Sequence, residues 1–218
     1  MKTKIILTAL LCALNINAAS AAIKGNVGAS YATDYYFRGA ELGADSIQAN
    51  IGVNTTVQKI EVFLDLLTNQ TTGTSTADTN VAVLAAGTTF SDGLLSLYGG
   101  LINIDVDGSE STLDGFVSLK LNTVLTPSVT VFRNTDDDLY TVEGSISHQI
   151  NTDLCDLTVS LDAGTTNVTR STNRSYVGAG FKISKDFDNL TPYASVSLID
   201  ADDISRDTIT QAGLTFKF

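Results

Sequence analysis

The sequence contains no tryptophan, one histidine (His148) and two cysteines (Cys12 and Cys155) among its 218 residues. Metal centres and nucleophilic active sites depend on clustered His and Cys side chains, so this scarcity argues against both. Cys12 lies within an apolar N-terminal run, which leaves Cys155 as the only thiol of the remaining chain and excludes an internal disulfide. The sequence therefore predicts no metal centre, no cofactor and no disulfide bridge.

Long apolar runs are also missing. After Ala22 no run approaches the about 20 apolar residues that a membrane-spanning helix needs. A membrane protein with this sequence would have to be a closed β-barrel, because only closure satisfies every backbone polar group in lipid. The N-terminal run over 5–14 is shorter, follows Lys2 and Lys4, and leads into small residues. This pattern predicts a secretory signal peptide over 1–22 and an exported domain over 23–218.

Basic residues are few. The chain has 13 Lys and Arg against 24 Asp and Glu, and two of the basic residues lie within 1–22, so 23–218 carries 11 against 24. Such an acidic chain disfavours nucleic acid as a partner. Many acids fall in expected loops, where they would form an acidic rim. The D-V-D-G-S-E stretch at 105–110 resembles part of a calcium loop without its full ligand spacing. We expect solvated loop charges, with Ca²⁺ or Mg²⁺ binding as the alternative.

Strand-like alternation recurs along the chain. In 57–67, Ile60 and Leu66 fall on one face and Glu61 and Asp65 on the other. Charged residues on the second face suit a wet interior better than a dry core. Twelve strands are expected, at 23–33, 45–54, 57–67, 79–90, 94–105, 113–125, 127–134, 140–150, 154–163, 176–182, 188–200 and from 205 to the end. Ten strands remain the alternative, because 94–105 and 127–134 alternate poorly.

The connections alternate in length. Short turns are expected near 54–57, 91–93, 125–127, 151–153 and 185–189, and longer loops at 34–45, 68–79, 105–112, 134–139, 164–173 and 200–206. Five inner turns and six outer loops are what a twelve-stranded barrel has when both of its ends lie in the periplasm. The fold class predicted is all-β, a transmembrane antiparallel up-and-down β-barrel of about 12 strands.

The last stretch, 208–218, places Leu214, Phe216 and Phe218 on one face and Lys217 on the other. It resembles the closing strand of bacterial outer-membrane barrels, whose assembly signal is an alternating strand that ends in Phe. The resemblance implies insertion by the barrel-assembly machinery, a bacterial outer-membrane location, and contact with outer-membrane lipid and lipopolysaccharide. Tyr and Phe residues near expected strand ends would supply the interfacial rings in the absence of Trp.

The charges divide between the two faces. Seven basic residues fall on the expected inward face, namely Lys24, Lys59, Lys120, Arg133, Arg174, Lys182 and Lys217. Seven acids join them, namely Glu61, Asp65, Asp114, Glu143, Asp156, Asp162 and Asp207. This balanced set would either brace a narrow barrel through ion pairs or line a pore and set its selectivity. The pore-lining residues predicted are Lys59, Glu61, Asp65, Lys120, Glu143, Asp156, Asp162, Arg174 and Lys182.

His148 is the only histidine available to a hydrolase. Outer-membrane lipid hydrolases place a Ser two residues after the catalytic His, whereas Ile150 occupies that position here and Ser147 points to the other face. The nucleophile and base therefore do not meet within this strand, and we expect no enzymatic activity.

Residues 26–39 (N-V-G-A-S-Y-A-T-D-Y-Y-F-R-G), followed by S-I-Q-A-N-I-G-V at 46–53, resemble the start of the TorF (Gcw-chp) family of outer-membrane porins. The resemblance covers about thirty residues and implies a barrel with a porin role. Within it, Gly39 could supply a positive φ and Arg38 could pair with Asp34. The function predicted is passive diffusion of ions or small polar solutes. The alternatives are a closed structural or receptor-like barrel with acidic binding loops, and a secreted soluble β-sandwich.

Overall fold

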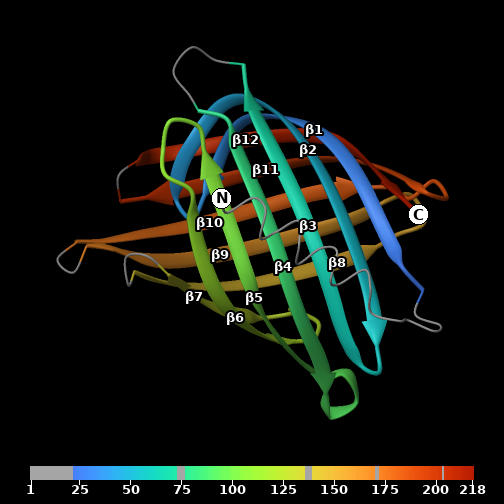
Figure 1. Ribbon diagram of the computed structural model, residues 1–218. Coiled ribbons are helices and arrows are strands. Elements are labelled where there is room, and N and C mark those ends of the chain that lie inside the picture. Colours follow the sequence, from blue (N-terminus) through green and yellow to red (C-terminus); the bar gives the residue numbers. More distant parts are fainter. Residues whose placement is uncertain (1–21, 73–76, 136–138, 170–171, 203) are drawn as a thin grey trace.

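The computed structural model describes residues 22–72, 77–135, 139–169, 172–202 and 204–218, and the predicted signal peptide lies outside them apart from Ala22. The described chain forms a closed barrel of antiparallel strands (Figure 1). The strands are β1 (Lys24–Phe37), β2 (Ala40–Val57), β3 (Ile60–Thr71), β4 (Thr79–Phe90), β5 (Leu95–Val106), β6 (Thr112–Leu121), β7 (Ser128–Asn134), β8 (Tyr140–Asn151), β9 (Asp156–Thr169), β10 (Thr172–Ser184), β11 (Leu190–Ala201) and β12 (Ile204–Lys217).

Each strand pairs with its neighbours in sequence, and β1 pairs with β12 from Asn26↔Lys217 to Ala32↔Gln211 to close the barrel. The prediction of an all-β up-and-down barrel with 12 strands is confirmed, and the ten-strand alternative is wrong. β5 alternates poorly because Ile102 and Ile104 face the interior, so apolar residues occupy both of its faces.

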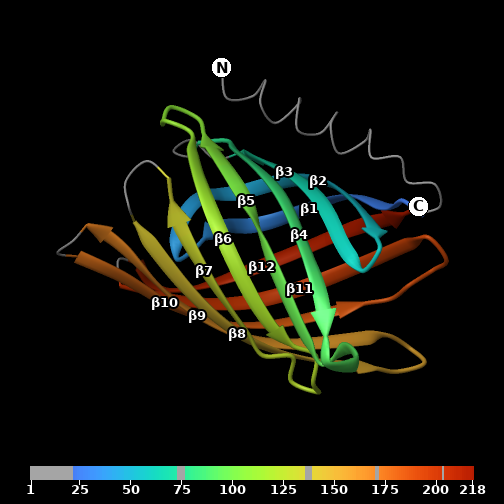
Figure 2. The same ribbon diagram turned by 60° about the horizontal axis from the view of Figure 1, so that its bottom comes forward.

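The barrel has two unlike ends. The turn end holds Lys24, Phe218 and five connections, whereas the loop end holds six (Figures 1 and 2). The loops expected at 34–45, 164–173 and 200–206 are wrong in extent, because backbone pairing continues through these polar stretches to Phe37, Thr169 and Ala201. Lys59, expected within a strand, lies instead in the tight turn between β2 and β3 with φ 143°.

The outer face of the sheet is apolar and exposed. Ile60 is 50% exposed and Val117 58%, and Leu214, Phe216 and Phe218 of the chain end are exposed as well. The faces of the strands are those expected from the alternation except in β7, where they are reversed. The β-sandwich alternative is wrong because there is one closed sheet with its apolar side outward. In the described part of the chain, no helix has the length and apolar character needed to cross a membrane.

Part of the interior is apolar, although the sequence predicted charged residues of both signs along the inner face. Val81 of β4 and Ile102 and Ile104 of β5 form a buried apolar cluster, and five partly buried side chains pack against it: Phe37, Leu67, Val83, Val106 and Phe132. These residues come from β1, β3, β4, β5 and β7, so the cluster fills part of the barrel interior from several sides.

Candidate functional site: the barrel interior

Along each strand, every second side chain belongs to the exposed apolar outer row. The side chains between them point to the other face of the sheet and form the inner row. Side chains on the concave surface of a barrel can reach past an intervening strand, as the following contacts show. Tyr98 of β5 donates to Glu61 of β3 (3.1 Å), and Tyr176 of β10 donates to Glu143 of β8 (2.5 Å). Across the closure, Gln211 of β12 donates to Gln48 of β2 (2.9 Å).

The register places eight of the nine predicted pore-lining residues on this inner row: Glu61, Asp65, Lys120, Glu143, Asp156, Asp162, Arg174 and Lys182. Lys59 is the ninth and lies in a turn. Arg133, also expected inward, lies on the outer row opposite Tyr140, with its Cζ atom 5.7 Å from the Tyr140 ring centroid. The reason is that Phe132 takes the inward position, where its ring packs 5.7 Å from that of Phe116.

The half of the interior toward the turn end is polar and accessible. Inner-row residues there are exposed although the sheet closes around them, namely Asp65, Lys120, Ser145, Gln149 and Lys182. Lys182 Nζ lies 4.4 Å from the centre of the Tyr193 ring. The barrel therefore has a solvent-accessible vestibule at its turn end, with charged residues of both signs.

The half toward the loop end is packed. Inner-row side chains are buried here, including Ser46, Gln48, Asn69, Thr79, Asp114, Thr141 and Tyr176. Ser46, Asn69 and Thr79 have no exposed surface. Because they lie on β2, β3 and β4, the filled region covers a broad part of the barrel wall.

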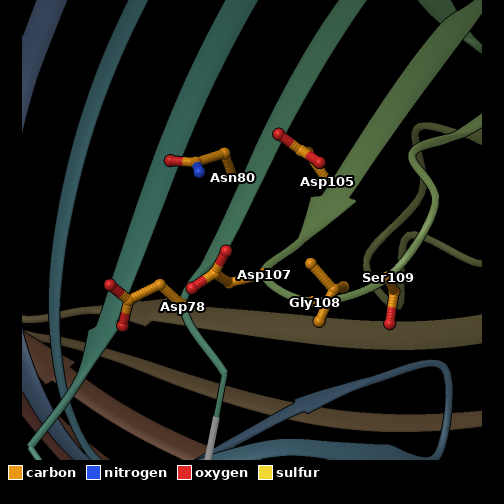
Figure 3. A pocket seen from close by; sticks show the side chains of 7 residues that line it. Asp78, Asn80, Asp105, Asp107, Gly108 and Ser109 are labelled. Carbon is orange, nitrogen blue, oxygen red and sulfur yellow. The ribbon is translucent and has the colours of Figure 1, made fainter.

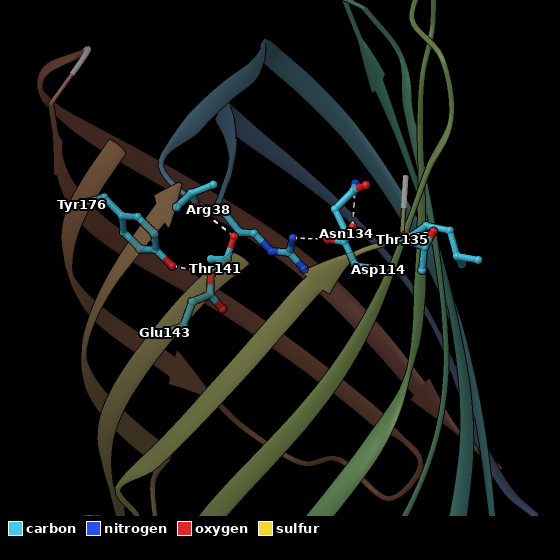
Figure 4. Close-up of polar contacts among 9 residues, drawn as sticks. Arg38, Asp114, Asn134, Thr135, Thr141, Glu143 and Tyr176 are labelled. Carbon is cyan, nitrogen blue, oxygen red and sulfur yellow. Dashed lines mark hydrogen bonds and ion pairs between the residues drawn. The ribbon is translucent and has the colours of Figure 1, made fainter. Parts of the chain in front are cut away.

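Arg38 occupies the centre of this packed region (Figure 4). Its Nη1 donates to Asp114 Oδ2 on β6, and Asn134 Nδ2 donates to the other carboxylate oxygen at 3.0 Å. The Arg38 Cζ atom lies 3.8 Å from the Phe132 ring centroid and 4.8 Å from that of Phe37. The side chains of Arg38 and Asp114 are 12% and 5% exposed, so the ion pair is buried. The expected pairing of Arg38 with Asp34 is wrong, because Arg38 pairs with Asp114 of β6.

Gly39 brings the same hairpin against β10. A Cβ atom added to Gly39 would lie 2.9 Å from Tyr176 Cβ, closer than real Cβ contacts, and the Gly39 φ is 75°. A side chain here would meet both a strained backbone and the Tyr176 ring. The glycine at the end of the D-Y-Y-F-R-G stretch thus permits the hairpin to lie directly against β10.

The acidic rim includes a small polar pocket of about 330 Å³ at the loop end (Figure 3). Its lining is Asp78, Asn80, Asp105, Val106, Asp107, Gly108 and Ser109. Asp78 Oδ1 accepts a hydrogen bond from the backbone of Thr71 (3.1 Å). Among the described residues no three His, Cys, Asp or Glu side chains are grouped closely enough to hold a metal ion.

His148 lies on the outer row opposite Val159, and its Nδ1 atom is 2.9 Å from the backbone oxygen of Val124. The ring therefore ties β8 to the β6–β7 turn.

A closed antiparallel barrel with an apolar outer surface and a polar, charged interior defines a membrane-embedded β-barrel protein. Its fold is similar to that of solved porins and channels. The KdgM porin shares 13% identity at a TM-score of 0.58, with 88% of this chain and 99% of that chain covered. The NanC porin shares 12% identity at a TM-score of 0.57, with 89% of this chain and 100% of that chain covered. An outer-membrane channel from Pseudomonas putida F1 shares 9% identity at a TM-score of 0.58, with 91% of this chain and 96% of that chain covered.

These identities are low, so the likeness concerns the fold. No family model matches the sequence, and no curated protein sequence matches it. The resemblance of 26–53 to the TorF (Gcw-chp) family therefore stays a hypothesis.

Proposed function

We propose that this protein is a porin-like channel of the bacterial outer membrane that lets ions or small polar solutes diffuse passively. The observation that carries the proposal is the vestibule: Asp65, Lys120 and Lys182 lie on the inner row of a closed sheet and are nevertheless exposed. Charged groups at such positions act on any ion that enters and so set selectivity. The barrel fold shared with solved porins supports the same function.

The proposal includes the surroundings of the barrel. The apolar outer row would contact outer-membrane lipid and lipopolysaccharide, and the alternating β12 ending in Phe218 would be recognised by the barrel-assembly machinery. Membership of the TorF family is part of this proposal and accounts for the D-Y-Y-F-R-G stretch. Cell fractionation tests the location, because a soluble periplasmic protein would not co-sediment with outer membranes.

The second candidate is a closed structural or receptor-like barrel, favoured by the buried packing around Arg38 and Asp114 at the loop end. Reconstitution of the purified full chain in planar bilayers separates the two. A channel gives discrete current steps whose ion selectivity changes with the inner-row charges. A closed barrel gives no current above the lipid background, with or without changes to those charges.

A further inference from the structure

The tip of the β1–β2 hairpin (residues 36–39, called the tip below) crosses the barrel interior and touches its wall on many sides. Tyr36 donates to Asp207 of β12 (2.7 Å), and Phe37 packs against the apolar cluster of β4 and β5. Arg38 reaches Asp114 of β6 and Phe132 of β7, and Gly39 lies against Tyr176 of β10. Contacts with six strands around the circumference place the tip in the middle of the lumen.

The backbone explains why this hairpin turns inward. The pairing of β1 with β2 shifts register after Tyr35, which pairs with Gly43, because Tyr36 pairs with Glu41 and leaves Leu42 of β2 as a bulge. A bulge bends the strand that carries it and increases its twist. Arg38 and Gly39 then form the two-residue turn with φ values of 51° and 75°. The D-Y-Y-F-R-G stretch thus supplies an apolar anchor, a cation and a tight turn in succession, and the bulge in the returning strand β2 supplies the bend.

Buried polar atoms without partners are concentrated in this region. Among the described residues, the buried side-chain N and O atoms without a hydrogen-bond partner belong to Arg38 (Nε and Nη2), Ser46, Asn69 and Thr79. Asn69 lies two residues along β3 from Leu67, which packs against the apolar cluster, and Thr79 lies two residues along β4 from Val81, which belongs to the cluster. Unpaired buried polar groups are unfavourable compared with hydrated ones, so movement of the tip that admits water would satisfy them.

We propose that the tip is a plug that closes the loop half of the channel, and that release of Arg38 from Asp114 opens it. The inference rests on the proposed channel function and accounts for its main difficulty, a lumen that is hydrated in one half and packed in the other. The closed arrangement is held by the buried ion pair, the Tyr36–Asp207 hydrogen bond and the apolar contact of Phe37, and it is opposed by the unpartnered polar atoms. In this proposal the tip therefore has a closed and an open arrangement. Solute passes when the tip leaves the lumen.

Conductance in planar bilayers tests the plug with Arg38→Ala and Asp114→Asn. Each variant removes one partner of the Arg38–Asp114 ion pair, called the latch below, and each should raise the mean current severalfold above that of the unaltered protein. Arg206→Ala is the matched control, because Arg206 pairs with Asp200 at 3.5 Å on the loop-end surface with both side chains largely exposed. Its current should equal that of the unaltered protein. Only folded protein, selected by its shifted gel mobility before heating, is reconstituted.

The outcomes separate the plug from the channel. Larger currents in both latch variants support the plug and the channel together. Equal currents in all variants overturn the plug and leave the channel standing. No current in any variant overturns the channel, and the plug with it. Arg38→Lys keeps the charge but loses the planar fork, so an intermediate current supports the latch if Arg38→Ala fails to fold.

A reversible tether gives a second measurement. Gly39→Cys with Tyr176→Cys, in a Cys155→Ser background, would join the tip to β10 once the two Cβ positions, 2.9 Å apart, have separated to the about 3.5–4.5 Å of a disulfide. Oxidation should abolish most of the current and reduction should restore it. The Gly39→Cys single variant should not respond to oxidation. Equal currents in the oxidised and reduced states of protein whose disulfide has formed overturn the plug.

Discussion

Lys217 of the last strand contacts Asp186 in the turn between β10 and β11, with its Nζ atom 2.9 Å from Oδ2 and 3.0 Å from Oδ1. Thr191 Oγ1 donates to the same carboxylate. The hydrogen bond from Thr191, which has the larger effect, and that from Lys217 hold the pKa of Asp186 below its ordinary value of 3.8. The contact ties the end of the chain to the turn of the preceding hairpin at the end of the barrel that carries Phe218.

We predict a pH-dependent contribution of this contact to stability. Because the folded pKa is lowered, the stabilisation is present above the unfolded pKa near 3.8 and is lost as the pH falls through the lower folded value. Urea unfolding in detergent micelles between about pH 6 and about pH 3 should show a larger loss for the unaltered protein than for Asp186→Asn. Asp188→Asn, in the same turn, is the control. Parallel pH profiles for the Asp186→Asn variant and the unaltered protein would contradict the prediction.

The exposed inner-row charges should set ion selectivity. Asp65→Asn removes a negative charge from the vestibule and should lower the ratio of cation to anion permeability, whereas Lys182→Gln should raise it. The reversal potential in a salt gradient measures both changes. Asp92→Asn alters a carboxylate in a turn outside the sheet and should leave the potential unchanged. Shifts of the same sign for Asp65→Asn and Lys182→Gln would refute the assignment of these residues to the pore lining.

The Tyr176 hydroxyl should stabilise the packed half of the barrel. Tyr176→Phe removes the donor to Glu143 and leaves a partly buried carboxylate without it, at a cost of about 1–3 kcal/mol. Urea unfolding of folded barrels in micelles measures the difference. Tyr193→Phe deletes a hydroxyl of the same kind while keeping the ring that Lys182 contacts, and it should change stability less. Equal effects of the two variants would show that the Glu143 contact contributes nothing.

A charge on the outer face should be costly only in the middle of the membrane. Leu161 is 49% exposed at the middle of β9, opposite Ile146 and Ala179. Leu161→Arg should destabilise the barrel in lipid bilayers by about 2–4 kcal/mol. Leu154 lies in the β8–β9 turn and is 84% exposed, so Leu154→Arg should be tolerated. If both substitutions were tolerated equally, the outer row would not face hydrocarbon.

Part of the interior could be predicted from the sequence and part could not. Alternation assigned Glu61 and Asp65 correctly to the inner row, because side chains change face at every residue of a strand. It failed at Arg133 and Phe132, where local pattern favoured the charged residue inside. The aromatic ring goes inward because Phe116 and Arg38 are there to pack against it. Those partners are separated from Phe132 in sequence and were not visible to a local pattern.

Loop boundaries show the same limit. Polar composition suggested loops through Asp34, Glu41 and Asp45, but these residues lie within long paired strands. Backbone hydrogen bonding across the hairpin extends the strands wherever a neighbour is available, whatever the side chains are.

The sequence by itself determined which side of most strands is apolar and in which order the strands pair, and it favoured twelve strands over ten. These properties follow from the two-residue period and from short connections between neighbours. Only the closed tertiary structure decided which side chains meet across the lumen. Arg38 and Asp114 are 76 positions apart and come together because curvature brings the bent tip of one hairpin to the opposite wall. No local pattern encodes that distance, since it depends on the diameter and closure of the whole barrel.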